Sequence, residues 1–249
     1  MSVEKSAGQL AGNSTWKEEE HYDALRRAML WRVNAPERYP DVIVQASSEQ
    51  EIQQALQFAT ENDLQVVCRS IGHNTAGAVL RNGGMLLDIS SMSDISVDAK
   101  QMTALVQPGL NMHYCYQKLA EHGLIFPLAE CHGVAMGGYL LGGGLPPVSH
   151  VWGKGPACYS IISADVILAN GEKVVASKDE NADIYWAIRG VGPGFFGVVS
   201  RYQLQLYQHP ETIMQSSFIF SLDVLPDVIS ILDKLLAVKD ERTAINLAL

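Results

Sequence analysis

The chain has no apolar run that approaches the roughly 18 to 20 residues needed to cross a bilayer. Residues 1–20 are polar and include Glu18, Glu19 and Glu20, so they lack the basic start and apolar centre of a secretory signal. We therefore expect a cytoplasmic protein without a membrane partner.

Clustered positive charge is also missing. Lys and Arg number 18 against 27 Asp and Glu, which gives a formal net charge of −9. Proteins that bind nucleic acid neutralise its phosphates with grouped Lys and Arg. We therefore expect no nucleic-acid partner.

Cysteine is sparse, and its spacing indicates no metal centre. Cys68, Cys115, Cys131 and Cys158 form no C-x-x-C pair, so neither a zinc site nor a disulfide framework is predicted. Cys131 and His132 are disfavoured as joint metal ligands or as a catalytic pair, because neighbouring side chains on a strand or loop point apart. We expect His113 and Cys115 to lie at the start of a helix.

The dinucleotide fingerprint G-x-G-x-x-G after a first strand is absent as well. A Rossmann domain thereby loses its main support. An NAD-dependent dehydrogenase stays open as a rival hypothesis, which a test for nicotinamide dependence would decide.

The sequence does carry enough apolar residues for a full core, 47% of 249. Apolar spacing predicts helices over residues 15–32, 49–59, 112–121, 183–189 and 226–238. It predicts strands over residues 64–68, 85–89, 103–107, 163–169, 172–176, 198–206, 215–222 and 244–249. This alternation favours an α/β or α+β layered fold.

Local signals sharpen several of these elements. Ser48 and Glu51 have the spacing of a capping box at a helix start. Asn170-Gly171 predicts a hairpin with a type I′ turn, in which both residues have positive φ. In the helix over 183–189, we expect Trp186 in the core and Arg189 capping the C-terminal end.

Four segments place small residues where backbone could approach a large flat molecule. Each glycine alone could be a turn, but their order along the chain is informative. The segments are Arg69-Ser70-Ile71-Gly72-His73-Asn74, Cys131-His132-Gly133-Val134-Ala135-Met136-Gly137-Gly138, Gly142-Gly143-Gly144 and Gly192-Pro193-Gly194-Phe195-Phe196-Gly197.

Through these segments the chain resembles the FAD-binding domain of the vanillyl-alcohol oxidase superfamily, also called the p-cresol methylhydroxylase (PCMH) type. It is most similar to the branch that resembles berberine bridge enzyme. The resemblance implies a two-subdomain α+β fold in three parts: a helical extension at 1–37, a PCMH-type FAD-binding domain at 38–212, and an incomplete α/β substrate-binding domain at 213–249. The chain then looks C-terminally truncated.

The resemblance also implies FAD as the cofactor. His73 stands where the family links a histidine to the methyl group of the flavin's dimethylbenzene ring, a bond that raises the redox potential. The segment Arg69, Ser70, Ile71, Gly72, His73, Asn74 would form a loop whose backbone N–H groups hold the pyrophosphate. Gly133, Val134, Gly137, Gly138 and Gly142 would lie along the flavin, and Gly197, Val198 and Val199 would line its adenine and pyrophosphate end.

Cys131 matches the position of a second covalent anchor in the berberine-bridge-like branch. Its alternative role is that of a small packed residue, because free cysteine behaves as a small hydrophobe. The sequence leaves both roles open.

The chain departs from the family pattern at two places. Ile71 replaces a glycine, and a β-branched residue adopts positive φ poorly. Either its backbone keeps ordinary dihedral angles or the pyrophosphate loop is altered. Pro146-Pro147 stand where relatives have a glycine and an aromatic residue, which predicts a stiffened or reshaped slot beside the ring.

The implied activity is an FAD-linked oxidoreductase, an oxidase or dehydrogenase that moves a hydride from an alcohol, sugar or amine carbon of a small molecule onto the flavin. Dioxygen or another acceptor would reoxidise the cofactor. The sequence identifies no catalytic base. The alternative is a truncated flavin-binding remnant without turnover.

Overall fold

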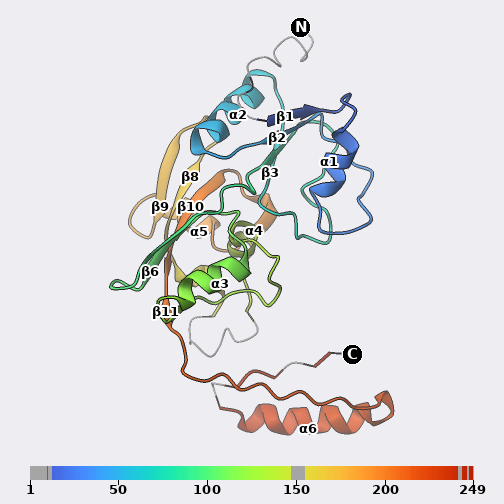
Figure 1. Ribbon diagram of the computed structural model, residues 1–249, viewed down its shortest axis with the longest axis vertical. Helices are drawn as coiled ribbons and strands as arrows, with labels where there is room; N and C mark the ends of the chain where they lie inside the picture. Colours follow the sequence, from blue (N-terminus) through green and yellow to red (C-terminus); the bar gives the residue numbers. More distant parts are fainter. Residues whose placement is uncertain (1–9, 11–12, 147–154, 241–242, 246, 249) are drawn as a thin grey trace.

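The computed structural model describes residues 10, 13–146, 155–240, 243–245 and 247–248. Two β-sheets, each with its own helices, lie against one another to form the body of the protein (Figure 1). The predicted α+β organisation in two subdomains is confirmed.

The first sheet has the strand order β1-β2-β4-β3. Its strands β2 and β3 both run parallel to the central β4, whereas β1 pairs with β2 antiparallel. The bounds are β1 (Asn13–Trp16), β2 (Val42–Gln45), β3 (Val66–Arg69) and β4 (Met85–Asp88). β3 is therefore an edge strand of this sheet, and it ends directly before the loop that carries His73.

Each face of this sheet packs on a helix, because successive side chains of a strand point to opposite faces. Val42 and Val44 join the core cluster of α2 (Glu49–Glu61), whereas Ile43 joins that of α1 (Tyr22–Ala28). Ile167 and Val198 of the second sheet belong to the α2 cluster too, so one continuous core connects the two sheets.

The start of the chain differs from the prediction of one helix over residues 15–32. Residues 13–16 form β1, which completes the first sheet, and the helix is confined to α1. Pairing with β2 supplies backbone hydrogen bonds that outweigh the weak helical pattern of this stretch.

The capping box of α2 is confirmed for the Ser48 side chain, but Glu51 pairs with Ser47 in place of Ser48. The Ser48 hydroxyl accepts the backbone N–H of Glu51 at 3.2 Å, but the Glu51 carboxylate reaches back to the N–H and hydroxyl of Ser47. These bonds lower the pKa of Glu51. They satisfy backbone donors that the helix itself cannot pair.

The second sheet is antiparallel throughout, with the order β5-β6-β10-β8-β9. Along β10, Tyr202 and Leu204 are buried while Gln203 and Gln205 are only half-buried, the predicted pattern of one covered face. The bounds are β5 (Ile95–Asp98), β6 (Thr103–Val106), β8 (Ile161–Ile167), β9 (Lys173–Ser177) and β10 (Val198–Gln205).

The β8–β9 hairpin is confirmed, but its turn type is not I′. Gly171 has φ +81°, whereas Asn170 is absent from the described non-glycine residues with positive φ. The Gly171 N–H donates to Leu168 and the Leu168 N–H donates to Glu172, so a longer loop with a left-handed glycine closes the hairpin.

The helices of the second subdomain are α3 (Met112–Ala120), α4 (Met136–Leu141) and α5 (Ala182–Ala187). α3 starts where predicted, with the Asn111 side chain accepting the N–H of Tyr114 at 2.8 Å, and His113 and Cys115 lie in its first turns. A two-stranded ribbon of β7 (Leu124–Ile125) and β11 (Tyr207–Gln208) closes this part of the fold.

The prediction that Trp186 belongs to the core is wrong, since it is 75% exposed on α5. The interior face of that helix is taken by Ile184 and Ala187 instead. Arg189 does cap the helix, donating from Nε to the carbonyl of Tyr185 at 3.3 Å.

Beyond β11 the chain leaves the body, and α6 (Leu225–Val238) lies apart from both sheets (Figure 1). α6 confirms the predicted helix, but residues 215–222 are not a strand and neither are the described residues of 244–249. A strand requires a hydrogen-bonded neighbour, and none pairs with these segments in the described chain.

Among the described residues, no helix combines the length and apolar character needed to span a membrane.

Candidate functional site

The side chain of Arg69 holds the loop that follows β3. Its guanidinium is buried and donates to Asp88 Oδ1 at 2.6 Å, to the Met29 carbonyl at 2.7 Å and to the Ile71 carbonyl at 2.7 Å. Asp88 is the last residue of β4 and is buried as well. Arg69 therefore shapes the loop from inside, with its charge neutralised by Asp88.

Two glycines allow close contacts between segments distant in sequence. Gly72 has φ +78°, and a Cβ there would overlap the Met29 carbonyl oxygen. A Cβ on Gly137 would overlap Ser70 Oγ. The predicted loops around residues 69–74 and 131–138 thus meet where side chains are smallest.

Ile71 keeps ordinary backbone dihedral angles, because it is absent from the described non-glycine residues with positive φ. Only Gly72, the next residue, takes the left-handed conformation. Of the two possibilities left by the sequence, the loop thus adopts the one in which isoleucine is tolerated.

The loop also presents a row of backbone donors with no partner in the described part of the chain. None of the N–H groups of residues 70–74 donates a hydrogen bond to another described residue. Consecutive N–H groups of this kind form a concave site suited to an anion. The Asn74 side chain instead turns back to accept the N–H of Ala76 at 3.0 Å.

Facing this loop, Cys131 lies beside His73. The Cys131 Sγ and His73 Nε2 are 3.3 Å apart although 58 residues separate them in the sequence. Cys131 is exposed and His73 half-buried. The structure therefore brings both predicted covalent anchors to one point.

The residue after Cys131 points elsewhere, as expected of neighbouring side chains. The His132 ring lies 5.0 Å from that of His113, at the start of α3. The backbone of the same segment is fixed to α3, because Met112 N–H donates to the Val134 carbonyl at 2.9 Å. Among described residues no group of three or more His, Cys, Asp or Glu could hold a metal ion.

The remaining predicted glycines divide into two groups. Gly133 lies near His73, since a Cβ added to Gly133 would be 4.0 Å from His73 Cδ2. A Cβ on Gly138 would meet open space. Gly142 instead ends α4, its N–H donating to the Gly138 carbonyl at 3.1 Å. Pro147, one of the two prolines at which the chain departs from the family pattern, lies outside the described residues.

A small cavity lies between the two sheets. Its volume is about 220 Å³, and it is lined by Cys68 of β3, by Phe196 and Gly197, and by Val198, the first residue of β10. Val199, the next residue, is buried and pairs with Val166 of β8. Cys68 directly precedes Arg69 in the chain, but none of residues 69–74 lines this cavity.

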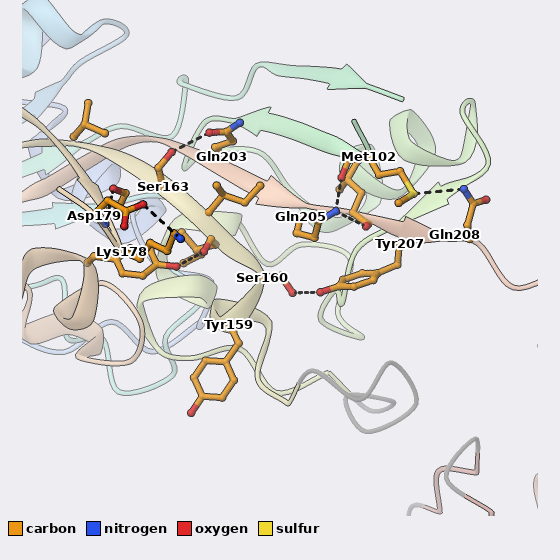
Figure 2. A pocket seen from close by; sticks show the side chains of 16 residues that line it. Met102, Tyr159, Ser160, Ser163, Lys178, Asp179, Gln203, Gln205, Tyr207 and Gln208 are labelled. Atoms are coloured by element: carbon orange, nitrogen blue, oxygen red, sulfur yellow. Dashed lines mark hydrogen bonds and ion pairs between the residues drawn. The ribbon is translucent and has the colours of Figure 1, made fainter. Parts of the chain in front are cut away.

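A larger cavity of about 870 Å³ lies elsewhere, along β8 and β10, and none of the sequence-predicted site residues lines it (Figure 2). Its polar side chains pair with one another: Ser163 with Gln203 at 3.1 Å, and Ser160 with Tyr207 at 2.8 Å. We place the candidate site at His73 and Cys131, where titratable groups converge with backbone donors that have no partner among the described residues.

The four cysteines differ in their surroundings, and all are free. Burial raises the pKa of Cys68 and of Cys115 to about 12, and burial also raises that of Cys158. These three are therefore poor nucleophiles at neutral pH. Cys131 is the exposed one.

Sequence reasoning missed three residues of this site: Met29, Trp31 and Asp88. Trp31 stacks on the His73 ring at 4.7 Å between centroids, with 22° between the planes. No local motif marks the segment after α1 as part of the site. A polar residue at the end of the buried strand β4 is a signal that could have pointed to Asp88.

Comparison with known proteins identifies the family of this chain. Residues 40–177 match the family described as an FAD binding domain, and the chain belongs to that family. An FAD-linked oxidoreductase of Penicillium crustosum, penO, is 31% identical over 221 residues, which cover 89% of this chain and 48% of that protein. The chain spans about half the length of the curated relatives it matches.

Solved structures show the same fold. 6-Hydroxy-D-nicotine oxidase from Arthrobacter nicotinovorans aligns with a TM-score of 0.72 and 29% identity, over 80% of this chain and 43% of that one. Xylooligosaccharide oxidase from Myceliophthora thermophila C1 gives 0.74 and 29%, over 84% and 43%. A berberine-bridge-enzyme-like protein of Physcomitrella patens gives 0.74 at 24% identity, so the fold is the PCMH-type FAD-binding fold.

Proposed function

We propose that this chain binds FAD covalently through His73 and Cys131 and forms the flavin-binding part of an oxidoreductase. The observation that carries the proposal is the 3.3 Å approach of His73 Nε2 to Cys131 Sγ. An imidazole and a thiol are both nucleophiles. Each bond to the flavin would replace an N–H or S–H bond of the protein and a C–H bond of the flavin, with two electrons passing to the flavin and from it to dioxygen or another acceptor. Their separation is small enough for both to reach one edge of a single ring.

The rest of the site suits the rest of FAD. The N–H groups of residues 70–74 can receive the pyrophosphate, since they lack partners among the described residues. Arg69 contributes through loop shape and not through its charge, which Asp88 already neutralises. The cavity of about 220 Å³ beside Gly197 and Val198 is the candidate position of the adenine.

When bound, FAD supplies the capacity to accept a hydride, while the protein supplies position and electrostatics. The names of the relatives, a nicotine oxidase and a xylooligosaccharide oxidase, support an alcohol, sugar or amine carbon of a small molecule as the hydride donor. Their oxidase names also support dioxygen as the acceptor, with another acceptor as the alternative.

A second candidate function is a flavin-binding protein without turnover. It is favoured by the large apolar side chains exposed after Pro210, among them Phe218 and Ile219 at 78% and 98% exposure. In this state the chain would load FAD, yet its flavin would not be reduced by alcohols, sugars or amines. Anaerobic bleaching of the flavin absorption by such compounds decides between the two candidates.

The proposal is tested by the absorption spectrum before and after denaturation. We expect the flavin to stay with the precipitated protein, to remain through one bond with a changed spectrum in Cys131→Ala, and to be released from the double variant His73→Ala/Cys131→Ala. The control is His132→Ala, which removes an exposed histidine beside Cys131 and should match wild type. Complete release of flavin from the wild-type protein by acid would refute covalent attachment.

A further inference from the structure

Trp31 lies in the segment after α1 and contacts His73 and the loop that carries it. Its indole stacks on the His73 imidazole, with 4.7 Å between centroids and an interplanar angle of 22°. The indole is otherwise largely in solvent, with 62% of the residue exposed. A side chain this exposed contributes little to the core, so its placement calls for another explanation.

The backbone around Trp31 is tied to the histidine loop at several points. The Trp31 N–H donates to the Gly72 carbonyl at 3.2 Å, and Arg69 Nε donates to the Met29 carbonyl at 2.7 Å. Arg32 Nη1 reaches the Thr75 carbonyl at 2.8 Å. Residues 29–32 thus run alongside the loop. The hydrogen bonds between the two segments hold the backbone from which the indole projects.

The imidazole also contacts Cys131. A stacked indole restricts rotation of the imidazole about its side-chain bonds, and Nε2 then faces Cys131 Sγ at 3.3 Å. A nucleophile reacts fastest when it is held in the reactive geometry before reaction. The stack restricts the ring without occupying either of its nitrogen atoms.

Resting on the flavin attachment proposed above, we propose that Trp31 is a positioning residue that holds the His73 imidazole in the orientation required for covalent attachment. The chemical requirement is a flat aromatic surface. Trp31→Phe should preserve this positioning role in large part. Trp31→Leu, which keeps an apolar side chain but removes the ring, should not.

The stacking itself is tested by NMR on the flavin-free protein. Protons of an imidazole stacked on indole are shifted upfield by the ring current, and His73→Gln identifies the resonances. We expect the upfield shift to be lost in Trp31→Leu, largely retained in Trp31→Phe and unchanged in Trp186→Leu, which removes a tryptophan that is 75% exposed and has no ring contact among the described residues. His73 ring protons with the same chemical shifts in Trp31→Leu as in wild type would contradict the stacking.

The positioning role is tested by the rate at which added FAD becomes resistant to release on denaturation. We expect Trp31→Leu to slow attachment on the order of 10-fold to 100-fold, with an unchanged far-UV spectrum. Trp31→Phe and Trp186→Leu should stay close to wild type. Attachment at the wild-type rate in Trp31→Leu would overturn the role.

The two proposals fail in different ways. Wild-type protein that never binds FAD covalently contradicts the proposed function and with it the attachment role, while the NMR shift still decides the stack. Normal covalent loading in wild type together with normal loading in Trp31→Leu contradicts only the role of Trp31.

Discussion

The body of the protein and the segment after Pro210 use similar apolar residues with opposite results. In β4, Leu86 and Leu87 are at most 1% exposed, whereas Ile219 is 98% exposed and α6 has no buried residue. Apolar patterning predicted α6, but it did not provide a surface for α6 to cover. Patterning determines which face of an element is apolar, and burial requires a second element against that face.

The largest effect expected in the body comes from the buried ion pair. Asp88→Asn removes the charge that neutralises Arg69, and leaving a buried charge unpaired costs about 3–5 kcal/mol of unfolding free energy. Urea unfolding measures the loss, and Asp94→Asn, an exposed aspartate, is the control. A loss below 1 kcal/mol would show that the pair does not hold the loop.

A matched pair of deletions tests the contrast directly. Leu87→Ala leaves a cavity in the core around α2 and should cost about 2–5 kcal/mol. Ile219→Ala removes a comparable side chain that is 98% exposed and should change stability by no more than about 0.5 kcal/mol. Equal losses in the two variants, measured by urea unfolding, would mean that residue 219 is buried in solution.

A smaller, pH-dependent effect is expected where α2 meets the second sheet. Burial disfavours charged Glu49, but hydrogen bonds from Lys173 and Ser200 and the charges of Lys173 and Arg201 outweigh it, so the pKa of Glu49 lies below its usual value near 4.5. The stabilisation from ionised Glu49 is therefore present above that usual value and is lost as the pH falls through the lower pKa of the folded state.

Because this group is partly exposed, we expect Glu49→Gln to cost about 1 kcal/mol or less at pH 7, and the difference from wild type to shrink when the pH is lowered to 3. Unfolding free energies at the two pH values measure it, with the exposed Glu61→Gln as control. A difference that stays constant between pH 7 and pH 3 would remove the charge from the explanation.

Much of the body was predictable because its signals are local. Ser48 with Glu51 marked the start of α2, and alternation marked β10. The strand at residues 13–16 was missed because its partner, β2, is distant in sequence. The turn at Asn170-Gly171 was assigned the wrong type because the dipeptide is compatible with more than one loop length.

The candidate site shows the same division. The family resemblance carried by residues 69–74 directed attention to His73, and the resemblance to the berberine-bridge-like branch did so for the thiol of Cys131. Their 3.3 Å approach depends on the packing of two subdomains, which no local pattern encodes. Trp31 could not be found from sequence, because an exposed tryptophan after a short helix has no distinguishing signal.

The most direct test of the central claim is mass spectrometry of proteolytic peptides from the FAD-loaded protein. Joint attachment predicts one flavin-containing species in which the peptide with His73 and the peptide with Cys131 are joined through the flavin. Cys131→Ala should leave the flavin on the His73 peptide alone. Unmodified masses for both peptides in yellow wild-type protein would contradict the account.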